Sequence, residues 1–359
     1  MVDSKQAPLD SAAAAKAAFA SVQDKPFPDD IFTAPELRWA VIGCGVIANQ
    51  MAQSLALAGR KLAGVANRTL SKAQAFAEQY GIEKVYDTVE DLYADPNIDA
   101  VYITTPHNTH ITYLRAALAA GKHVLCEKAI TLNSAELDEA CAIADEHNVV
   151  LMDATTVLHM PLYQELRRRM DAGEFGRMNL AQLNFGSYKE YGDLTNRFYN
   201  RNLAGGAMLD IGVYALSVMR LFMASQPIEV VSLGNTCETG VDVAGGIVCR
   251  NAEQQLGVVS LTLHSKQPKR SIISFDKCYI EVNEYPRADH ATIVWTADGH
   301  REEVHAGTEA YALCYEMADL EKAVAGDDSK RELLGYASDV MELMTKLRAD
   351  WGVVYPEEE

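Results

Sequence analysis

The chain has 359 residues, of which 48% are hydrophobic and 23% charged, so it can fill ordinary globular cores and is long enough for two domains. The 32 basic and 50 acidic residues give a net charge of −18, which argues against nucleic acid and anionic membranes as partners. No apolar run approaches the ~18 residues of a membrane span, and no secretory signal is recognised. The seven cysteines lack C-x-x-C spacing, so we expect a cytoplasmic protein with no metal site.

Residues 1–36 form an extension that precedes the first expected strand. Its alanine-rich part, Ser11–Ala20, predicts a helix capped by Asp10 or Ser11. The proline-containing run Lys25–Asp30 then breaks regular structure. We interpret the extension as a surface arm that packs on the body of the protein or on a partner subunit.

The run Gly43-Cys44-Gly45-Val46-Ile47-Ala48 follows a short apolar strand, Arg38–Ile42, and opens a helix. This order is typical of a dinucleotide site, because the first glycine permits a tight turn and the second lets the main chain approach a pyrophosphate. Ala48 keeps the helix close to the strand, and the helix N-terminus offers free N–H groups to the phosphates. The alternative is a glycine turn without a ligand. The residues expected to bind the cofactor here are Gly43, Gly45, Val46 and Ile47.

Residues 37–154 alternate short apolar strands with helices. Strands are expected at 62–66, 84–86, 100–104, 122–126 and 149–152, and helices at 71–80, 89–94, 109–120 and 134–147. This alternation predicts a parallel, doubly wound sheet, in which ligands bind beyond the C-terminal ends of the strands. The residues that follow each strand are therefore the first candidates for a site.

Asn67 and Arg68 follow the second strand, where an acidic side chain would accept hydrogen bonds from the ribose hydroxyls of NAD. No acid is present, and the Arg68 guanidinium can pair with a 2′-phosphate instead. NADP(H) is therefore favoured and NAD(H) remains possible. The alternative is that Arg68 is an ordinary solvated arginine.

Polar residues also follow the fourth and fifth strands. The residues expected to bind the cofactor here are Thr105, Pro106, His107, Asn108, Glu127 and Lys128, and His107 and Asn108 are expected to face its nicotinamide half. Thr109 or Asn108 is expected to cap the next helix, and His110 is interpreted as a helix-end residue. The Lys128 ammonium can bind a substrate hydroxyl and lower the pKa of a neighbouring acid. Its alternative role is a surface pair with Glu127.

Residues 155–330 have a different pattern. An amphipathic helix at 159–172 precedes strand-like runs at 179–188, 228–237, 245–249, 257–263, 271–275, 278–282 and 291–296. Few helices intervene, so these runs predict a large open, mostly antiparallel sheet in an α+β domain. We therefore predict an α/β fold in which a Rossmann domain at 37–154 is followed by this domain at 155–330. Helices are expected at 307–325 and 331–351. Residues 331–359 are expected to form a helix that covers the first domain and an acidic, solvated tail.

A glycine-rich stretch, Leu203–Tyr214, leads into a helix expected at 215–224. Asp210 and Tyr214 are four residues apart, so they share one helix face. A carboxylate and a phenol on one face can perform acid–base chemistry. The alternative is a core residue beside a helix cap.

Taken together, these motifs resemble the family of glucose-fructose oxidoreductase, inositol dehydrogenase and rhizopine-catabolism proteins. The resemblance spans about residues 38–350 and rests on Gly43–Ala48, on Thr105-Pro106 with His110, on Glu127-Lys128 and on Gly205–Gly212. It implies a Rossmann domain and an open sheet that often forms the subunit interface. It also implies an NAD(P)-dependent oxidoreductase of sugars, polyols or diols. Tyr214 and Arg68 resemble the branch of dihydrodiol dehydrogenase and NADP-dependent xylose dehydrogenase. The implied partners are a small-molecule substrate and a second copy, in a homodimer or homotetramer built through the C-terminal sheet.

The chain departs from the family pattern at two places. Ala129 stands where the family usually has proline, so the preceding peptide bond is expected to be trans. The stretch Thr155–His159 lacks the aromatic-arginine pair of the branch, so no named substrate is carried over. Candidates for the substrate pocket are Tyr188, Arg197 and Arg201.

The resemblance implies reversible hydride transfer, with Tyr214 as general acid/base. Lys128 and the positive nicotinamide would lower the pKa of Tyr214, and Asp210 would hold Lys128 or a second substrate hydroxyl. Two alternatives remain open from the sequence: NAD-dependent glycoside hydrolysis through transient oxidation, and a nucleotide-binding sensor without turnover.

Overall fold

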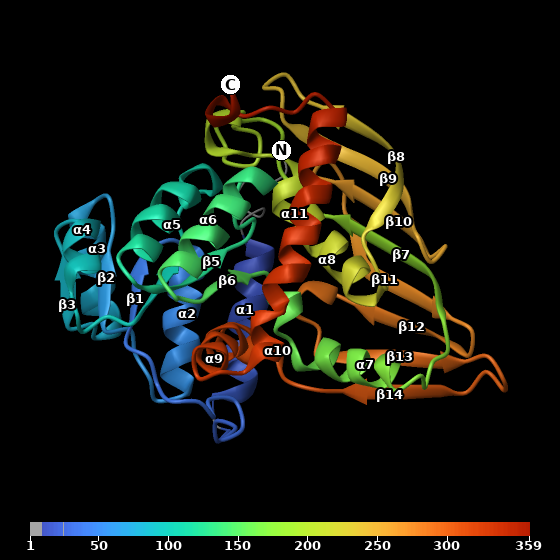
Figure 1. Ribbon diagram of the computed structural model, residues 1–359, viewed down its shortest axis with the longest axis horizontal. Coiled ribbons are helices and arrows are strands. Elements are labelled where there is room, and N and C mark those ends of the chain that lie inside the picture. The colour runs from blue at the N-terminus through green and yellow to red at the C-terminus, as the bar shows by residue number, and fades with distance from the viewer. Residues whose placement is uncertain (1–8, 24) are drawn as a thin grey trace. The chain divides into compact units, whose positions relative to one another are not determined.

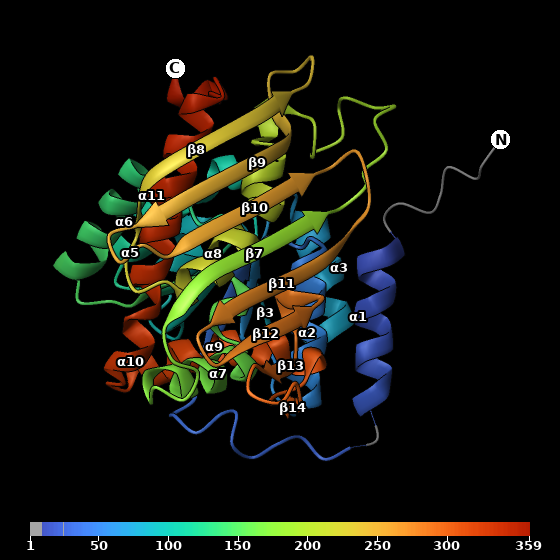
Figure 2. The same ribbon diagram turned by 90° about the vertical axis from the view of Figure 1, so that its right-hand side faces the viewer.

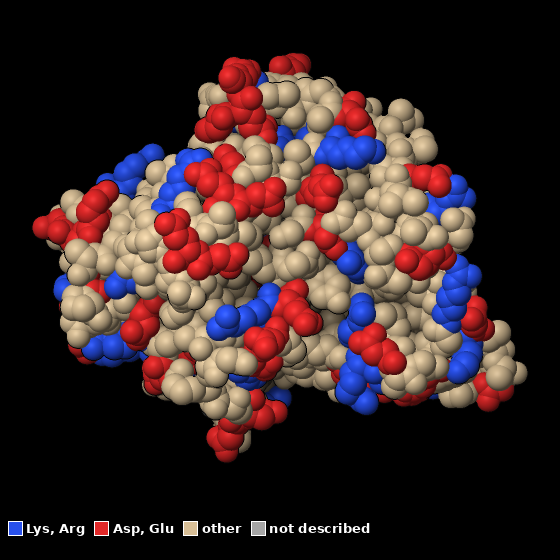
Figure 3. Space-filling view, in the orientation of Figure 1, with Lys and Arg blue, Asp and Glu red and all other residues tan. Residues whose placement is uncertain are grey.

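The computed structural model describes residues 9–23 and 25–359, which divide into two compact units (Figure 1). The first unit comprises the chain up to Thr131, Ala135–Ala154 and Ala310–Gly335, and the second comprises Leu132–Ser134, Thr155–Glu309 and Tyr336–Glu359. Acidic side chains are interspersed with basic ones on the face that Figure 3 shows, in keeping with the net charge of −18.

The sheet of the first unit has six strands in the order β3-β2-β1-β4-β5-β6, all of them parallel. The strands are β1 (Trp39–Ile42), β2 (Gly64–Ala66), β3 (Lys84–Tyr86), β4 (Ala100–Ile103), β5 (His123–Glu127) and β6 (Leu151–Ala154). The helices are α1 (Leu9–Val22), α2 (Val46–Leu57), α3 (Leu70–Tyr80), α4 (Val89–Ala94), α5 (His110–Ala119), α6 (Ser134–Glu146), α9 (Ala312–Val324) and α10 (Asp328–Arg331). This is the predicted Rossmann-type fold, and the strand order reverses between β1 and β4, where such sheets bind their ligands.

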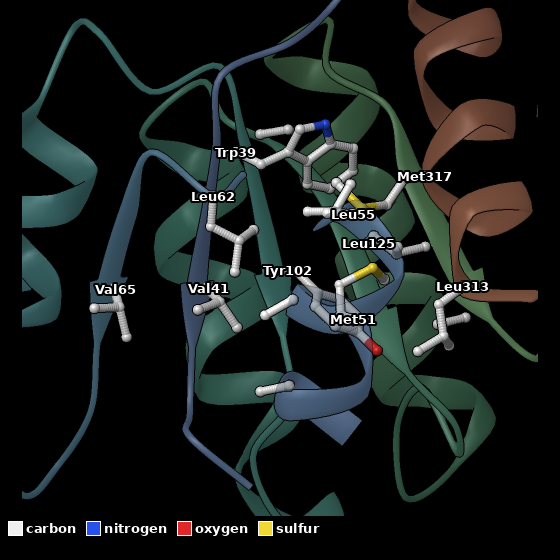
Figure 4. Packing of buried hydrophobic residues seen from close by; sticks show 14 of the residues in the cluster. Trp39, Val41, Met51, Leu55, Leu62, Val65, Tyr102, Leu125, Leu313 and Met317 are labelled. Carbon is white, nitrogen blue, oxygen red and sulfur yellow. The ribbon is translucent and has the colours of Figure 1, made fainter. Parts of the chain in front are cut away.

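The core of the first unit is apolar on both faces of β1. Val41 lies opposite Val65 on one neighbouring strand and Tyr102 on the other. Figure 4 shows how Met51 of α2 packs among these side chains and how Met317 of α9 joins the same cluster. A sheet that is buried on both faces explains why its strands read as continuous apolar runs rather than as alternating ones.

Helix α9 corrects the expected division of the chain. Residues up to 330 were expected in the second domain and 331–351 on the first, but 310–335 cluster with the first unit and 336–359 with the second. The reason is burial of α9 in the first core, together with a charged contact. Glu321 of α9 accepts hydrogen bonds from Trp39 Nε1 (3.0 Å) and Arg60 Nη2 (2.6 Å).

The second unit contains an eight-stranded sheet in the order β14-β13-β12-β11-β7-β10-β9-β8 (Figure 2). Only the pair β7 and β10 is parallel among its described strands, so the sheet is mostly antiparallel, as predicted. The strands are β7 (Met178–Gly186), β8 (Pro227–Thr236), β9 (Asp242–Asn251), β10 (Leu256–Thr262), β11 (Gln267–Phe275), β12 (Cys278–Asn283), β13 (His290–Trp295) and β14 (Arg301–His305). Its helices are α7 (Pro161–Asp171), α8 (Val213–Phe222) and α11 (Leu333–Asp350). Strand β14 escaped prediction because Val304 is its only buried residue.

Helix α8 begins earlier than predicted, and a π-helical turn, Met208–Gly212, precedes it. The segment Arg201–Phe222 is long and apolar enough to cross a membrane by length and composition alone. In its most apolar window, however, 83% of the residues are buried inside the protein, which fits a core helix.

The two ends of the chain differ in how far they match expectation. The predicted N-terminal helix is confirmed as α1. Residues 1–8 and Asp24 of the extension lie outside the described residues. The side chains of the predicted caps Asp10 and Ser11 are also outside the described part of the chain. The expected solvated C-terminal tail is wrong. Tyr355 is fully buried, and a short 3-10 helix, Pro356–Glu358, follows it.

Candidate cofactor and active site

The glycine turn after β1 has the geometry that a dinucleotide site requires. Gly43 has φ +105°, and a Cβ atom there would lie 2.5 Å from Thr104 Oγ1, so only glycine fits. A Cβ atom on Gly45 would meet no atom within 4 Å. Open space therefore lies beside Gly45, the residue that precedes the first turn of α2, and the N–H groups of such a turn favour a pyrophosphate. Val46 is 68% exposed at the start of this helix, and Ala48 is buried against the sheet.

The turn after β2 presents Arg68 to solvent. Asn67 folds back, with its side-chain amide donating to the Thr69 carbonyl oxygen at 3.0 Å. Among residues 9–23 and 25–359 the Arg68 guanidinium has no hydrogen-bond or ion-pair partner, so it can accept an external anion without breaking an internal contact.

The turn after β4 is tied to the turn after β5 by His110. Its Nδ1 lies 3.0 Å from the Ala129 carbonyl oxygen, and its Nε2 lies 2.8 Å from that of Thr105. Burial lowers the pKa of His110, and a neutral imidazole can donate to only one of these two carbonyls. His110 is therefore a structural link between the two turns, in line with its reading as a helix-end residue.

His107 and Asn108 lie in a 3-10 turn, His107–Thr109, that precedes α5. The expected capping of α5 by Thr109 or Asn108 is wrong. No side-chain cap bond is formed, because the Thr109 hydroxyl instead lies 2.7 Å from the Pro106 carbonyl oxygen and 2.8 Å from Thr105 Oγ1.

The end of β5 is fixed by Glu127. Its carboxylate accepts a hydrogen bond from the Tyr102 hydroxyl on β4 and another from the Lys128 backbone N–H at 3.2 Å. Lys128 itself is half-buried. The expected trans bond after Lys128 is wrong, since the Lys128–Ala129 bond is cis. That prediction rested on residue type alone, whereas Ala129 is fully buried and its carbonyl contacts His110.

Asp210 and Tyr214 lie in the second unit on one continuous helical segment. Asp210 falls within the π turn and Tyr214 in the first turn of α8, and such π turns occur often at functional sites. Arg197 Nη2 lies 3.5 Å from Asp210 Oδ1, a pairing that the sequence did not predict. Tyr214 is half-buried, with its ring 6.1 Å from that of Phe185.

The other two pocket candidates are placed differently. Tyr188 is exposed after β7. Arg201 is engaged by the C-terminal end of the chain, because its Nε donates to the Val354 carbonyl oxygen at 2.7 Å and its guanidinium pairs with Glu359. This contact follows from the burial of a tail that was expected to be solvated.

Two residues, one in each unit, were missed by reasoning from sequence. Tyr102 on β4 was read only as an apolar strand residue, although its hydroxyl reaches Glu127. Asp242 begins β9, is fully buried and accepts a hydrogen bond from the Met208 backbone N–H at 2.6 Å. Its signal was a lone carboxylate between Val241 and Val243. No group of three or more potential metal ligands is found in the part of the chain that the structure describes.

Comparisons with known proteins agree with this geometry. Residues 37–155 match the GFO_IDH_MocA oxidoreductase family with an NAD-binding Rossmann fold, and residues 163–281 match the GFO/IDH/MocA C-terminal domain. The trans-1,2-dihydrobenzene-1,2-diol dehydrogenase of Mus musculus is 32% identical over 69% of this chain and 75% of its own length. The dehydrogenase of the same name from Sus scrofa is 28% identical over 90% of this chain and 99% of its own length.

Solved structures show the same fold. KijD10, a 3-ketoreductase from Actinomadura kijaniata in complex with NADP and TDP-benzene, superposes with a TM-score of 0.75 at 24% identity, over 88% of this chain and 98% of its own. Levoglucosan dehydrogenase in complex with NADH and levoglucosan superposes with a TM-score of 0.75 at 19% identity, over 86% of this chain and 97% of its own.

Proposed function

Because the chain belongs to the Gfo/Idh/MocA family of NAD(P)-binding oxidoreductases, we propose that it oxidises a vicinal diol or sugar hydroxyl, and reduces the matching carbonyl, with NADP(H) as its preferred cofactor. The diol class is supported by the relatives named trans-1,2-dihydrobenzene-1,2-diol dehydrogenase. The observation that carries the cofactor preference is Arg68, exposed after β2 with no internal partner among the described residues.

The residues of the first unit fit a bound dinucleotide. The open space beside Gly45 admits the pyrophosphate, and the Arg68 fork suits a 2′-phosphate, which it can bind through two parallel hydrogen bonds. The other proposed cofactor contacts are Gly43, Val46, Ile47, Asn67, Thr105, Pro106, His107, Asn108, Glu127 and Lys128. When bound, the nicotinamide supplies the carbon that accepts or donates the hydride.

We assign the proton transfer to Tyr214. As the hydride leaves the substrate carbon, the C–O bond gains double-bond character and the hydroxyl proton passes to the Tyr214 phenolate; reduction reverses both transfers. A tyrosine of ordinary pKa, about 10, needs a nearby cation to ionise at neutral pH. We propose Lys128 for this role and for orienting the substrate hydroxyl. Asp210, held by Arg197, would bind Lys128 or a second hydroxyl, and Tyr188 and Arg197 would contact the rest of the substrate.

We also propose that the protein forms a homo-oligomer through the open face of its second sheet. Val231 on β8 lies directly opposite Val248 on β9, and both side chains are exposed. Leu233, two residues further along the same face, is 82% exposed. Neighbouring exposed apolar side chains of this kind mark an interaction surface.

The cofactor assignment is tested by titrating the protein with NADPH and NADH while following cofactor fluorescence. We expect NADPH to bind more tightly. Arg68→Ala should weaken NADPH binding by roughly tenfold or more, because a charge-assisted pair to the phosphate is lost, and should leave NADH binding within about twofold. Arg38→Ala serves as a matched control, because Arg38 precedes β1 and should change neither affinity. Equal loss for both cofactors, or tighter binding of NADH to the native protein, would contradict the assignment.

A further inference from the structure

The C-terminal segment, which we define as Trp351–Glu359, is built into the second unit. The Tyr355 hydroxyl donates a hydrogen bond of 2.6 Å to the Gly205 carbonyl oxygen, and its ring is fully buried. Gly205 begins the glycine-rich turn that leads into the π turn and α8. The last residues of the chain thus contact the point from which the helical segment carrying Asp210 and Tyr214 begins.

Asp242, at the start of β9, contacts the same turn. Its carboxylate accepts a hydrogen bond from the Met208 backbone N–H. This N–H is one of the donors that the start of a helix leaves without an intrahelical partner. Gly206 has φ +126°, and a Cβ atom there would clash with Asp242 Oδ1 and lie 3.4 Å from the Tyr355 hydroxyl. Asp242, Tyr355 and the two glycines therefore form one closely fitted contact.

The C-terminal segment is itself anchored by Arg348 of α11. This guanidinium is 2% exposed and lies 4.7 Å from the centre of the Tyr355 ring. Its Nη1 and Nη2 donate to the two carboxylate oxygens of Glu358 at 2.9 and 2.7 Å, a bidentate geometry that fixes both partners. Glu358 also accepts from the Tyr355 backbone N–H at 3.0 Å. Tyr355 therefore has little freedom to leave Gly205.

A second anchor lies at the start of the segment. Trp351 covers Gly234 of β8 and Gly245 of β9, where any Cβ atom would clash with its indole ring. Its Nε1 donates to Ser232 Oγ at 3.0 Å. Strands β8 and β9 thus contact the C-terminal segment through Trp351, and β9 also carries Asp242, so both contacts to the glycine turn involve the same sheet.

We propose that Tyr355 and Asp242 are positioning residues for Tyr214, acting through the Gly205–Met208 turn. Hydrogen bonds from two distant parts of the chain fix the turn, and the continuous helical segment that follows transmits its orientation six residues on, from Met208 to Tyr214. This inference rests on the proposed acid–base role of Tyr214. A small displacement of a group that transfers a proton lowers turnover while leaving cofactor binding intact.

The test compares Tyr355→Phe with Tyr163→Phe. Both remove one buried hydroxyl that donates to a backbone carbonyl in the second unit, since Tyr163 donates to Tyr285 at 2.7 Å, so they form a matched pair. The assay is oxidation of trans-1,2-dihydrobenzene-1,2-diol with NADP⁺. We expect kcat to fall roughly tenfold in Tyr355→Phe, with the Kd for NADPH unchanged, and kcat to stay within about twofold in Tyr163→Phe.

Amide hydrogen exchange of the peptide that spans 205–214 provides a readout independent of turnover. It should become faster in Tyr355→Phe and in Asp242→Asn, but not in Tyr163→Phe. Equal kcat and equal exchange in Tyr355→Phe and Tyr163→Phe would overturn the proposal. If Tyr214→Phe keeps full turnover, the proposed function fails, whereas the exchange of 205–214 still shows whether the turn is fixed by Tyr355 and Asp242. Asp242→Asn keeps the exchange test decisive if Tyr355→Phe does not fold.

Discussion

Asp242 shows how a single buried carboxylate can link stability to the candidate site. Its burial raises its pKa to about 6, against the opposing effect of the Met208 N–H bond and of the Arg348 charge. The folded protein therefore favours the protonated carboxyl more than the unfolded chain does. The stability that Asp242 contributes is fully present below its unfolded pKa, near 3.8, and is lost as the pH rises through about 6.

This pH dependence can be measured against Asp242→Asn, which does not titrate. The free energy of unfolding of the native protein, relative to that of the variant, should rise by about 2 kcal/mol between pH 7 and pH 4.5. Urea unfolding followed by tryptophan fluorescence at both pH values gives this difference, and contributions from other carboxylates cancel because both proteins share them. A difference that is the same at both pH values, or smaller at pH 4.5, would contradict the assignment.

At the residue scale, the sequence predicted the groups whose role depends on their own chain neighbours. Gly43 and Gly45 are examples, since a turn and a helix start are local features. It failed where a distant segment decides the environment. Arg201 is held by Val354, and Ala129 is contacted by His110. In each pair the two residues are far apart in the sequence, so no local pattern could predict the contact.

At the scale of elements, hydrophobic period identified all six strands of the first sheet and seven of the eight in the second. It missed β14, in which only Val304 is buried and which therefore shows almost no apolar alternation. It also placed the start of α8 too late, because glycines are poor helix formers and the π turn Met208–Gly212 begins at a hydrogen bond to the distant residue Asp242.

The C-terminal elements show why burial of a charged segment is hard to predict. The run of glutamates after Tyr355 reads as a solvated tail, because ionised side chains are rarely buried without a partner. Here Glu358 has a partner in Arg348, and nothing in the sequence of α11 around Arg348 indicates this pairing. The Arg348–Glu358 pair anchors the acidic C-terminal segment, and Tyr355 of this segment contacts the Gly205 carbonyl oxygen.

At the scale of the whole molecule, the net charge argues against nucleic acid as a partner but gives no information on self-association. The alternating pattern of β8 predicted a strand without showing that its exposed face is the more apolar one. Val231 and Leu233 are among the most exposed large apolar side chains of the described residues, at 75% and 82%. Contact with a second copy of the chain would remove these apolar side chains from water.

If the proposed oligomer forms through this face, replacement of both residues, as Val231→Asp with Leu233→Asp, should dissociate it. Two acidic groups would face each other across the interface between molecules that already carry a charge of −18 each, which is unfavourable. Light scattering after size exclusion should show the mass of a single chain for this variant. Leu203→Asp, an apolar-to-acid change away from the sheet, should keep the native mass. A monomeric native protein, or an unchanged mass in the double variant, would contradict the interface.

The proposed function, an NADP-dependent oxidation in which Tyr214 transfers the proton, depends on the phenol of Tyr214. It is tested most directly by following NADPH formation at 340 nm with trans-1,2-dihydrobenzene-1,2-diol and NADP⁺, in the native protein and in Tyr214→Phe. We predict turnover in the native protein and a loss of kcat of about 10²- to 10⁴-fold in the variant, because an acid–base group is removed, with NADPH binding retained. Turnover of Tyr214→Phe close to that of the native protein would contradict the claim.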